Sequence, residues 1–287
     1  MKPAQQTTLA NINLVRFITN TLGEGFKKKY GQNFLINQKS LLRFMHAIDP
    51  EAEDTLVEIG PGIGIITYSL CERAQMVYCV EIDRGKKAAL EKTLENFSNY
   101  HIIWADAKKV NYQNIAAKEK VNRSTGQSFK VTGSLPYNAA KPIIHNLFTS
   151  GSNWSTATFF LQKEVAERYV SRPPHSAFLA MFTSLYADSE IKFFIPPKHF
   201  MPIPKVDTAV IQFARTDDYK HLDRNTITKF IKSGFMQPRK TVLNNLKQAG
   251  LTAQMLQDAG LDDRVRPSQL TLQNWIRLYE SLDEKTI

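Results

Sequence analysis

Apolar runs rich in β-branched and aromatic residues alternate with segments of helical periodicity through the first two-thirds of the chain. Strand–helix alternation with nearly continuous apolar strands favours an α/β fold built on a parallel, doubly wound sheet. The last two predicted strands have no helix between them, which predicts an antiparallel pair at the edge of that sheet. The predicted strands cover residues 55–60, 76–83, 101–107, 129–133, 156–162, 191–196 and 209–215. The predicted helices cover residues 65–73, 86–97, 142–149, 163–170 and 177–186.

The two ends of the chain have a different pattern. Beyond about residue 217 the periodicity is helical, with Gly250 and Gly260 as helix stops. Near the N-terminus, apolar residues recur at helical spacing, which predicts an amphipathic helix packed on the body of the protein; they are Leu9, Ile12, Val15, Ile18 and Leu22. We therefore predict an N-terminal helical extension over 1–25, an α/β domain over 26–216 and a small all-helical domain over 217–287.

Charge narrows the classes of partner. The chain has 37 Lys and Arg against 27 Asp and Glu, a formal net charge of +10. This imbalance favours a polyanion, with nucleic acid ahead of a membrane surface, although composition alone allows a merely soluble basic protein equally well. No apolar run reaches the roughly 18 residues of a membrane helix. Together with the lack of a signal peptide, this predicts a soluble, cytoplasmic protein, with a transit peptide as a weaker alternative.

Cysteine and histidine give little support for a metal. Cys71 and Cys79 are too few and too poorly spaced for a metal knuckle, and their apolar neighbours predict reduced thiols in the core. The six histidines are scattered without metal-ligand spacing. We predict no metal site.

Candidate chemistry gathers where the first three predicted strands end. Gly60, Gly62 and Gly64 follow the first strand, spaced so that the backbone can turn tightly and approach a ligand. Glu81 ends the second strand, 21 residues after Gly60, where a carboxylate can accept both ribose hydroxyls. Asp106 ends the third, placed to accept an adenine amine. Each feature also has a simpler interpretation: the glycines as only a tight turn, Glu81 as a solvated acid at a strand end, and Asp106 as a cap of the following helix. Together they predict a site for an adenosine-containing ligand that needs no pyrophosphate.

The fourth strand ends in "SLPYN", residues 134–138, and this turn suggests a clamp for an amine. An adenine amine becomes nucleophilic when it pyramidalises, which two hydrogen-bond acceptors would favour. Ser134 Oγ and the Leu135 carbonyl can supply them, and Pro136 helps hold that carbonyl outward because its φ is fixed. Tyr137 offers a ring face on which a flipped base can stack.

With these motifs in order, the chain resembles the ribosomal RNA adenine N6,N6-dimethyltransferases over roughly residues 26–275. The likeness rests on "VEIGPGIG", "VEID", "ADA" and "GSLPYN", and on four further segments: "FKKKYGQNFL" (26–35), "LQKEVAER" (161–168), "PPKHFMPIPKVDTAV" (196–210) and "FMQPRKTVLNNL" (235–246). The resemblance implies a Rossmann-like methyltransferase sheet with S-adenosylmethionine as the methyl donor. It places Asn33 and Leu35 at the methionine end of that cofactor and Phe200 against the target base.

The sequence departs from the family pattern at two places. Serine stands at position 134 where the family usually has asparagine; it still supplies an acceptor, but with a shorter reach. "AAKP" (139–142) replaces the usual Ile-Ser-Thr-Pro and brings Lys141 near the cleft. These changes bear on turnover and on the number of methyl groups added more than on cofactor binding.

Two basic clusters are candidates for RNA contact. One lies within residues 229–247, in a stretch without an acid, and the other, Lys27 to Lys29, lies beside the first motif. A charge run is usually a solvated face. Next to an rRNA-modifying core we prefer phosphate contacts, which position RNA without reading its sequence. The predicted RNA-binding residues are Lys27, Lys28, Lys232, Arg239 and Lys240.

The resemblance implies a monomeric enzyme that dimethylates adenines of small-subunit rRNA, two adjacent ones in a 3′-terminal hairpin, during biogenesis of that subunit. Methyl transfer would be direct, without a metal. The first alternative is a large-subunit rRNA methyltransferase of the macrolide-resistance type, which shares every cofactor motif. The second is a non-catalytic ribosome assembly factor, which is supported only by Ser134 and "AAKP".

Overall fold

The computed structural model describes residues 33–118, 128–136 and 138–282. The predicted extension over 1–25, Lys27, Lys28 and Tyr137 lie outside these residues. The chain divides into two compact units: Met1–Lys163 with Ile191–Phe213, and Glu164–Glu190 with Ala214–Ile287. The second unit contains the whole of the predicted C-terminal domain, and it also takes in Glu164–Glu190, which the sequence pattern had assigned to the α/β domain.

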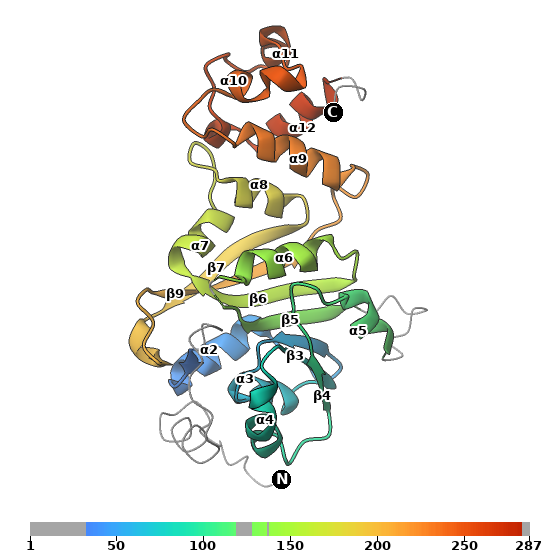
Figure 1. The fold of residues 1–287 in the computed structure, drawn as a ribbon, viewed down its shortest axis with the longest axis vertical. Helices are drawn as coiled ribbons and strands as arrows, with labels where there is room; N and C mark the ends of the chain where they lie inside the picture. Colours follow the sequence, from blue (N-terminus) through green and yellow to red (C-terminus); the bar gives the residue numbers. More distant parts are fainter. Residues whose placement is uncertain (1–32, 119–127, 137, 283–287) are drawn as a thin grey trace. The chain divides into compact units, whose positions relative to one another are not determined.

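A seven-stranded sheet forms the centre of the α/β fold, in the order β4-β3-β2-β5-β6-β9-β7 (Figure 1). Four neighbouring pairs, β4–β3, β3–β2, β2–β5 and β5–β6, are parallel. Every predicted strand is present, and the last two, β7 and β9, are neighbours with β7 at the edge. The strands are β2 (Thr55–Ile59), β3 (Met76–Glu81), β4 (Tyr100–Trp104), β5 (Phe129–Ser134), β6 (Trp154–Gln162), β7 (Ala187–Ile195) and β9 (Thr208–Arg215).

Helices cover both faces of this sheet, as the doubly wound prediction requires. Phe160 in β6 packs against Phe44 of α2, with ring centroids 4.0 Å apart. Phe159 faces the other way, toward Phe213 of β9, which meets Phe148 of α6 edge to face. Adjacent strand residues point to opposite faces, so both faces of β6 are buried. The helices of this part are α2 (Gln38–Ile48), α3 (Ile65–Cys71), α4 (Lys87–Thr93), α5 (Tyr112–Lys118) and α6 (Ala140–Thr149), with a 3₁₀ turn η2 (Arg84–Lys86) before α4.

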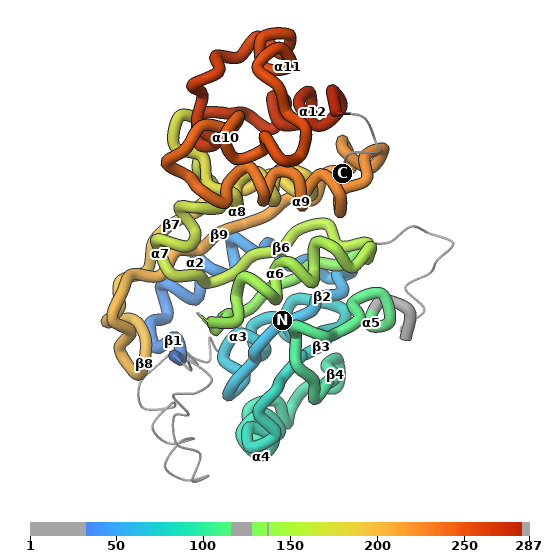
Figure 2. The backbone as a smooth tube through the Cα atoms, turned by 45° about the horizontal axis from the view of Figure 1, so that its top comes forward, coloured from blue at the N-terminus to red at the C-terminus, as the bar shows by residue number. Residues whose placement is uncertain are grey.

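A second, two-stranded sheet was not predicted. β1 (Phe34–Leu35) lies beside β8 (Phe200–Met201) (Figure 2) and pairs with it antiparallel. Leu35 is opposite Phe200 in this pair. The 3₁₀ turn η3 (Pro197–His199) leads into β8, and the His199 carbonyl accepts the Ile36 N–H at 2.8 Å. α2 was also missed; it begins where the Asn37 side chain accepts the Ser40 N–H at 3.0 Å. The pairing of β1 with β8 therefore joins two segments that are 165 residues apart in the chain.

The second unit is helical around a buried tryptophan, Trp275. Phe230 and Phe235 pack on its ring at 6.0 and 5.5 Å. Gly234 lies against the same ring, so closely that a Cβ there would overlap it. The elements are α7 (Lys163–Tyr169), α8 (Phe178–Ser184), α9 (Arg224–Gly234), α10 (Val242–Leu246), η4 (Lys247–Ala249), α11 (Ala253–Asp258), η5 (Pro267–Gln269) and α12 (Leu272–Glu280). Among the described residues, no helix has the length and apolar character needed to cross a membrane.

Candidate active site

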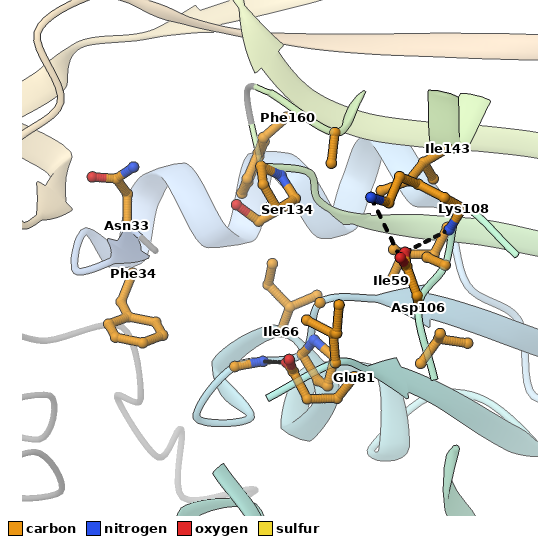
Figure 3. Close-up of a pocket in the computed structure, with 18 of the residues that line it drawn as sticks. Asn33, Phe34, Ile59, Ile66, Glu81, Asp106, Lys108, Ser134, Ile143 and Phe160 are labelled. Atoms are coloured by element: carbon orange, nitrogen blue, oxygen red, sulfur yellow. Dashed lines mark hydrogen bonds and ion pairs between the residues drawn. The ribbon is translucent and has the colours of Figure 1, made fainter. Parts of the chain in front are cut away.

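The candidate site lies at the carboxyl ends of the parallel strands, where the direction of winding changes. From β2 the chain winds outward to β3 and β4, and then returns to β5 on the other side of β2. Such a switch point leaves a crevice above the strand ends. A cavity of the α/β unit is lined there by residues that follow β2, β3, β4 and β5, and by residues of β1 and β6. Figure 3 shows Asn33, Glu81, Asp106 and Ser134 around it.

The glycine-rich turn after β2 lets the backbone form one wall of this cavity. Gly60 and Gly62 have φ of 72° and 60°, in the left-handed region that favours glycine. A Cβ on Gly60 would lie 3.3 Å from the Ser134 carbonyl oxygen. The end of β2 therefore meets the end of β5 closely, and both lie at the cavity.

Glu81 holds the glycine-rich turn from the next strand. Its Oε2 accepts the Gly62 N–H at 3.1 Å, and its Oε1 accepts the Asp83 N–H at 2.8 Å. Burial raises the pKa of Glu81, and these backbone hydrogen bonds act against that rise. The carboxylate lines the cavity, as the sequence predicted. It also fixes the loop, which spacing alone did not reveal.

Asp106 lines the cavity beyond β4 and has a partner that the sequence did not suggest. Its Oδ1 accepts the Lys108 N–H at 3.0 Å, and Lys108 Nζ lies 3.4 Å from Oδ2 (Figure 3). The Asp106 carbonyl also accepts the Lys109 N–H at 2.8 Å. Asp106 therefore caps a turn and also lines the cavity; its contact with an adenine amine stays a prediction.

The turn after β5 is anchored to the helix that follows it. The Pro136 carbonyl accepts the N–H groups of Ala139 and Ala140, both at 2.9 Å, at the start of α6. Ser134, Pro136, Asn138 and Ala139 line the cavity. Leu135 is not exposed on this turn, because its side chain is buried in the core.

The β1 segment closes another side of the cavity. Asn33 and Leu35 line it, and so does Phe34 between them; the contact of Asn33 and Leu35 with the methionine end of a cofactor stays a prediction. The Phe34 ring lies against Gly62 and has the fully buried Lys86 beside it, with Nζ 5.6 Å from the ring centroid. The sequence motif contained Phe34, but nothing in its spacing showed that the ring would pack on the glycine-rich turn.

Phe200 is not among the residues that line the cavity in this structure. Its side chain is buried, and its ring meets the Phe160 ring edge to face at 5.8 Å. Phe160 does line the cavity. The role expected of Phe200 against a target base stays a prediction.

Further residues at the site escaped the sequence reasoning. Ile82, directly after Glu81, is an exposed apolar side chain that lines the cavity. Lys108, two residues after Asp106, and Phe160, within β6, also line the cavity. Glu58, in β2, does not line the cavity but lies just before its glycine-rich turn. It is fully buried, and burial raises its pKa to about 8, although the Thr67 side chain partly offsets this. Glu58 belongs to the "VEIGPG" motif, but a carboxyl side chain in a strand is normally interpreted as exposed to solvent. Its burial was therefore not predicted.

The remaining candidate groups are the two cysteines, possible metal ligands and the cations of the helical unit. Cys71 and Cys79 are buried free thiols, as predicted, and burial raises the pKa of Cys71 to about 12. No group of three or more His, Cys, Asp or Glu side chains is gathered for a metal ion within the described parts of the chain. Lys232, Arg239 and Lys240 are exposed in the helical unit.

Comparisons with known proteins decide the family. Residues 23–284 match the family model described as ribosomal RNA adenine dimethylase. A protein of Lachnoclostridium phytofermentans named ribosomal RNA small subunit methyltransferase A is 37% identical, over 97% of this chain and 96% of that protein. One of the same name from Ligilactobacillus salivarius is 33% identical over 96% of each chain. The chain belongs to the ribosomal RNA adenine dimethylase family.

Solved structures support the fold of this dimethylase. A dimethyladenosine transferase from Plasmodium falciparum matches with a TM-score of 0.73 at 20% identity, over 88% of this chain and 98% of that one. The 23S rRNA methyltransferase ErmE matches with a TM-score of 0.67 at 21% identity, over 88% and 100%. As a member of the dimethylase family, the protein is an rRNA-modifying methyltransferase with a Rossmann-like α/β fold and a C-terminal helical region.

Proposed function

We propose that the protein transfers methyl groups from S-adenosylmethionine to the N6 amine of adenines in small-subunit rRNA, giving N6,N6-dimethyladenosine. We further propose two adjacent adenines of a 3′-terminal hairpin as the target, and a monomer acting in the cytoplasm during subunit biogenesis. The observation that carries the proposal is the meeting of β2 and β5, where the Gly60 turn and the Ser134 turn lie against each other and both line one cavity.

The donor set of the cavity suits an adenosyl cofactor. Glu81 supplies a carboxylate for the ribose hydroxyls, and Asp106 supplies an acceptor for an adenine amine. Ile82 and Ile66 offer apolar surface beside them. Gly62 leaves room for the Phe34 ring, which lines the cavity beside it, and Asn33 and Leu35 would hold the methionine end. When bound, S-adenosylmethionine supplies an electrophilic methyl group on its sulfonium, so no metal ligand is needed for its activation.

The residues after β5 would orient the nucleophile. Ser134 Oγ and the Leu135 carbonyl would accept the two N–H groups of the target amine, which favours its pyramidal form in the transition state. The nitrogen forms the new N–C bond as the bond from sulfur to the methyl carbon breaks, and the nitrogen's proton leaves to solvent. Tyr137 would stack on the flipped base, and Phe200 would support that stack through Phe160.

The exposed cations of the helical unit support rRNA as the polyanion. Lys232, Arg239 and Lys240 lie in a stretch from 224 to 257 without an acidic residue. Phosphate contacts by such groups position RNA without reading its sequence. We assign Lys27 and Lys28 to the same task, as a prediction from the sequence.

Transfer of a labelled methyl group tests this proposal. The purified protein is mixed with S-adenosylmethionine tritiated at the methyl group and with small subunits or large-subunit rRNA from cells lacking the modification. We expect label in small-subunit rRNA only, recovered as dimethyladenosine after digestion to nucleosides. Label in large-subunit rRNA instead would favour the macrolide-resistance type. RNA binding without any transfer would favour a non-catalytic assembly factor.

A further inference from the structure

A lysine and an aspartate that follow β4 form a pair inside the candidate active site. Among the described residues that line the cavity, Lys108 is the one cation, beside the carboxylates of Glu81 and Asp106. The Lys108 N–H donates to Asp106 Oδ1 at 3.0 Å, and Lys108 Nζ lies 3.4 Å from Asp106 Oδ2. Figure 3 shows the two side chains turned toward each other. Lys108 therefore contacts both oxygens of the carboxylate, and its ammonium group is held beside Oδ2.

The pair leaves hydrogen-bonding capacity on both of its members. The side chains of Lys108 and Asp106 are 44% and 26% exposed, and an ion pair with this exposure adds little to the stability of the fold. The separation of 3.4 Å is also longer than that of a strong charged hydrogen bond. An ammonium group has three N–H donors, and a carboxylate oxygen has more than one acceptor site. Lys108 Nζ and Asp106 Oδ2 can therefore each take a further partner from the cavity.

The walls beside the pair suit a flat ring. Ala105 and Ala107, on either side of Asp106, line the cavity with small side chains. The Ala105 N–H donates to the Glu81 carbonyl at 3.0 Å, so the exposed Ile82 that follows Glu81 lies next to this segment. Ile82 lines the cavity as well. A planar heterocycle can therefore rest on apolar surface while its edge reaches the carboxylate and the ammonium group.

The spacing of the pair matches one edge of an adenine. On the edge that presents N7 and N6, an acceptor and a donor lie about 3 Å apart, whereas N1 and N6 lie only about 2.3 Å apart. Lys108 Nζ is a donor and Asp106 Oδ2 is an acceptor, and they are 3.4 Å apart. The two protein atoms therefore complement N7 and N6, and their spacing fits that edge better than the edge that presents N1.

We infer that Lys108 donates a hydrogen bond to N7 of the cofactor adenine while Asp106 accepts its 6-amine, so that the pair recognises two neighbouring atoms of the ring. The inference deepens the proposed function, because it takes an adenosyl cofactor as given. A 6-oxo purine would place an acceptor against Asp106, and a ring without N7 would place a C–H group against Lys108 Nζ. Lys108 therefore adds a specificity-determining contact to the site.

A ligand altered at one atom tests this contact. S-adenosylhomocysteine and its 7-deaza analogue, in which a C–H group replaces N7, are titrated into the parent protein and into Lys108→Met by calorimetry. We expect the parent to bind the 7-deaza analogue about five- to twentyfold more weakly than S-adenosylhomocysteine, the scale of a hydrogen bond from a charged group. Lys108→Met should bind the two ligands within about twofold of each other, and should bind S-adenosylhomocysteine more weakly than the parent does.

Two controls separate the contact from charge and from the rest of the ring. Lys109→Met removes the same charge from an exposed neighbour that does not line the cavity, and keeps the Lys109 N–H that the Asp106 carbonyl accepts. It should discriminate between the two ligands as the parent does. The 1-deaza analogue of S-adenosylhomocysteine should lose affinity by the same factor in the parent and in Lys108→Met, because N1 does not face Lys108.

Three outcomes would overturn the inference. Equal affinity of the parent for S-adenosylhomocysteine and the 7-deaza analogue would show that N7 has no donor. Tighter binding of S-adenosylhomocysteine by Lys108→Met than by the parent would show that Lys108 competes with the cofactor for Asp106. A 1-deaza penalty that disappears in Lys108→Met would move the contact to N1. In all three cases the parent binds an adenosyl ligand and the proposed function stands, whereas a parent that binds no S-adenosylhomocysteine overturns the cofactor on which both proposals rest.

Discussion

The Phe34 ring occupies the space in which a side chain at Gly62 would stand. A Cβ on Gly62 would lie 2.7 Å from Phe34 Cε1, closer than carbon atoms approach in proteins. The two residues come from separate motifs and both line the cavity; Phe34 belongs to β1, which pairs with β8. The N-terminal motif therefore stabilises the glycine-rich turn as well as lining the cavity.

Gly62→Ala should weaken S-adenosylmethionine binding by about tenfold or more, because Ala at φ 60° is strained and its Cβ displaces the Phe34 ring. Gly260→Ala is the matched control, with φ 72° and nothing within 4 Å of its Cβ. Both should lower the free energy of unfolding by about 1 kcal/mol from backbone strain. Calorimetry of cofactor binding and chemical denaturation measure the two effects. Equal cofactor affinity in the two variants would contradict the role of the Phe34 contact.

Glu81→Ala should weaken S-adenosylmethionine binding by about 1–3 kcal/mol, the scale of hydrogen bonds to a charged group. The structure adds a second reason, since Glu81 also accepts the N–H groups of Gly62 and Asp83. Glu81→Gln is the informative comparison: its amide NH₂ would face one of those N–H groups, so it should bind the cofactor nearly as poorly as Ala. Calorimetry giving parent affinity for either variant would remove Glu81 from the cofactor site.

Ser134→Ala should lower the single-turnover rate of methyl transfer while leaving cofactor and RNA affinity nearly unchanged, because the acceptor matters most as the amine pyramidalises. Ser134→Asn restores the residue usual in the family and should keep or raise the rate, and favour the second methylation. Tyr137→Ala should weaken RNA binding by about 1–3 kcal/mol, because the stacking contact with the flipped adenine is lost. Products are resolved as mono- and dimethyladenosine. A Ser134→Ala enzyme as fast as the parent would refute the amine clamp.

Replacement of Arg239 and Lys240 by Ala should weaken binding to all rRNA sequences alike. The slope of log affinity against log salt should fall by roughly one unit per lost phosphate contact. Lys87→Ala with Lys92→Ala, on α4 of the other unit, removes the same charge from a helix whose lysines pair with Glu91 and Glu95. A salt titration that shows equal slopes for the two double variants would mean that residues 239 and 240 lie on a solvated face.

Stability should fall as the pH rises from about 5 to 8, because burial raises the pKa of Glu58 to about 8. Above its ordinary pKa the unfolded state releases the proton while the folded state retains it, so unfolding becomes more favourable until the pH passes the folded pKa. The slope from this group should reach about 1 kcal/mol per pH unit. Glu58→Gln should remove that slope in denaturation measured across the window, whereas Glu53→Gln, in an exposed turn, should not. An unchanged slope in Glu58→Gln would contradict a protonated Glu58.

The order of strands and helices was predictable because local pattern encodes it. Nearly continuous apolar strands such as "TLVEIG" must be buried on both faces, which demands helices on both sides of a parallel sheet. The strand ends then meet at one edge, so Gly60, Glu81, Asp106 and Ser134 could be placed at one site from sequence. α2 was missed although its local pattern indicates a helix, with Leu41, Phe44, Met45 and Ile48 buried at helical spacing after the Asn37 cap. β1 and β8 are two residues each, and their pairing could not be read from local pattern.

What the sequence alone determined, then, is the sheet, its carboxyl edge and the residue types found there. Tertiary structure decided which of those residues touch. Glu81 binds the Gly62 N–H, Phe34 covers Gly62, and Phe200 reaches the cavity only through Phe160, and none of these contacts follows from spacing. Spacing along one strand fixes the face on which a side chain lies, because the period is two. Contacts between strands and loops depend on how separate segments pack in three dimensions, as when β1 pairs with β8 from a distant part of the chain.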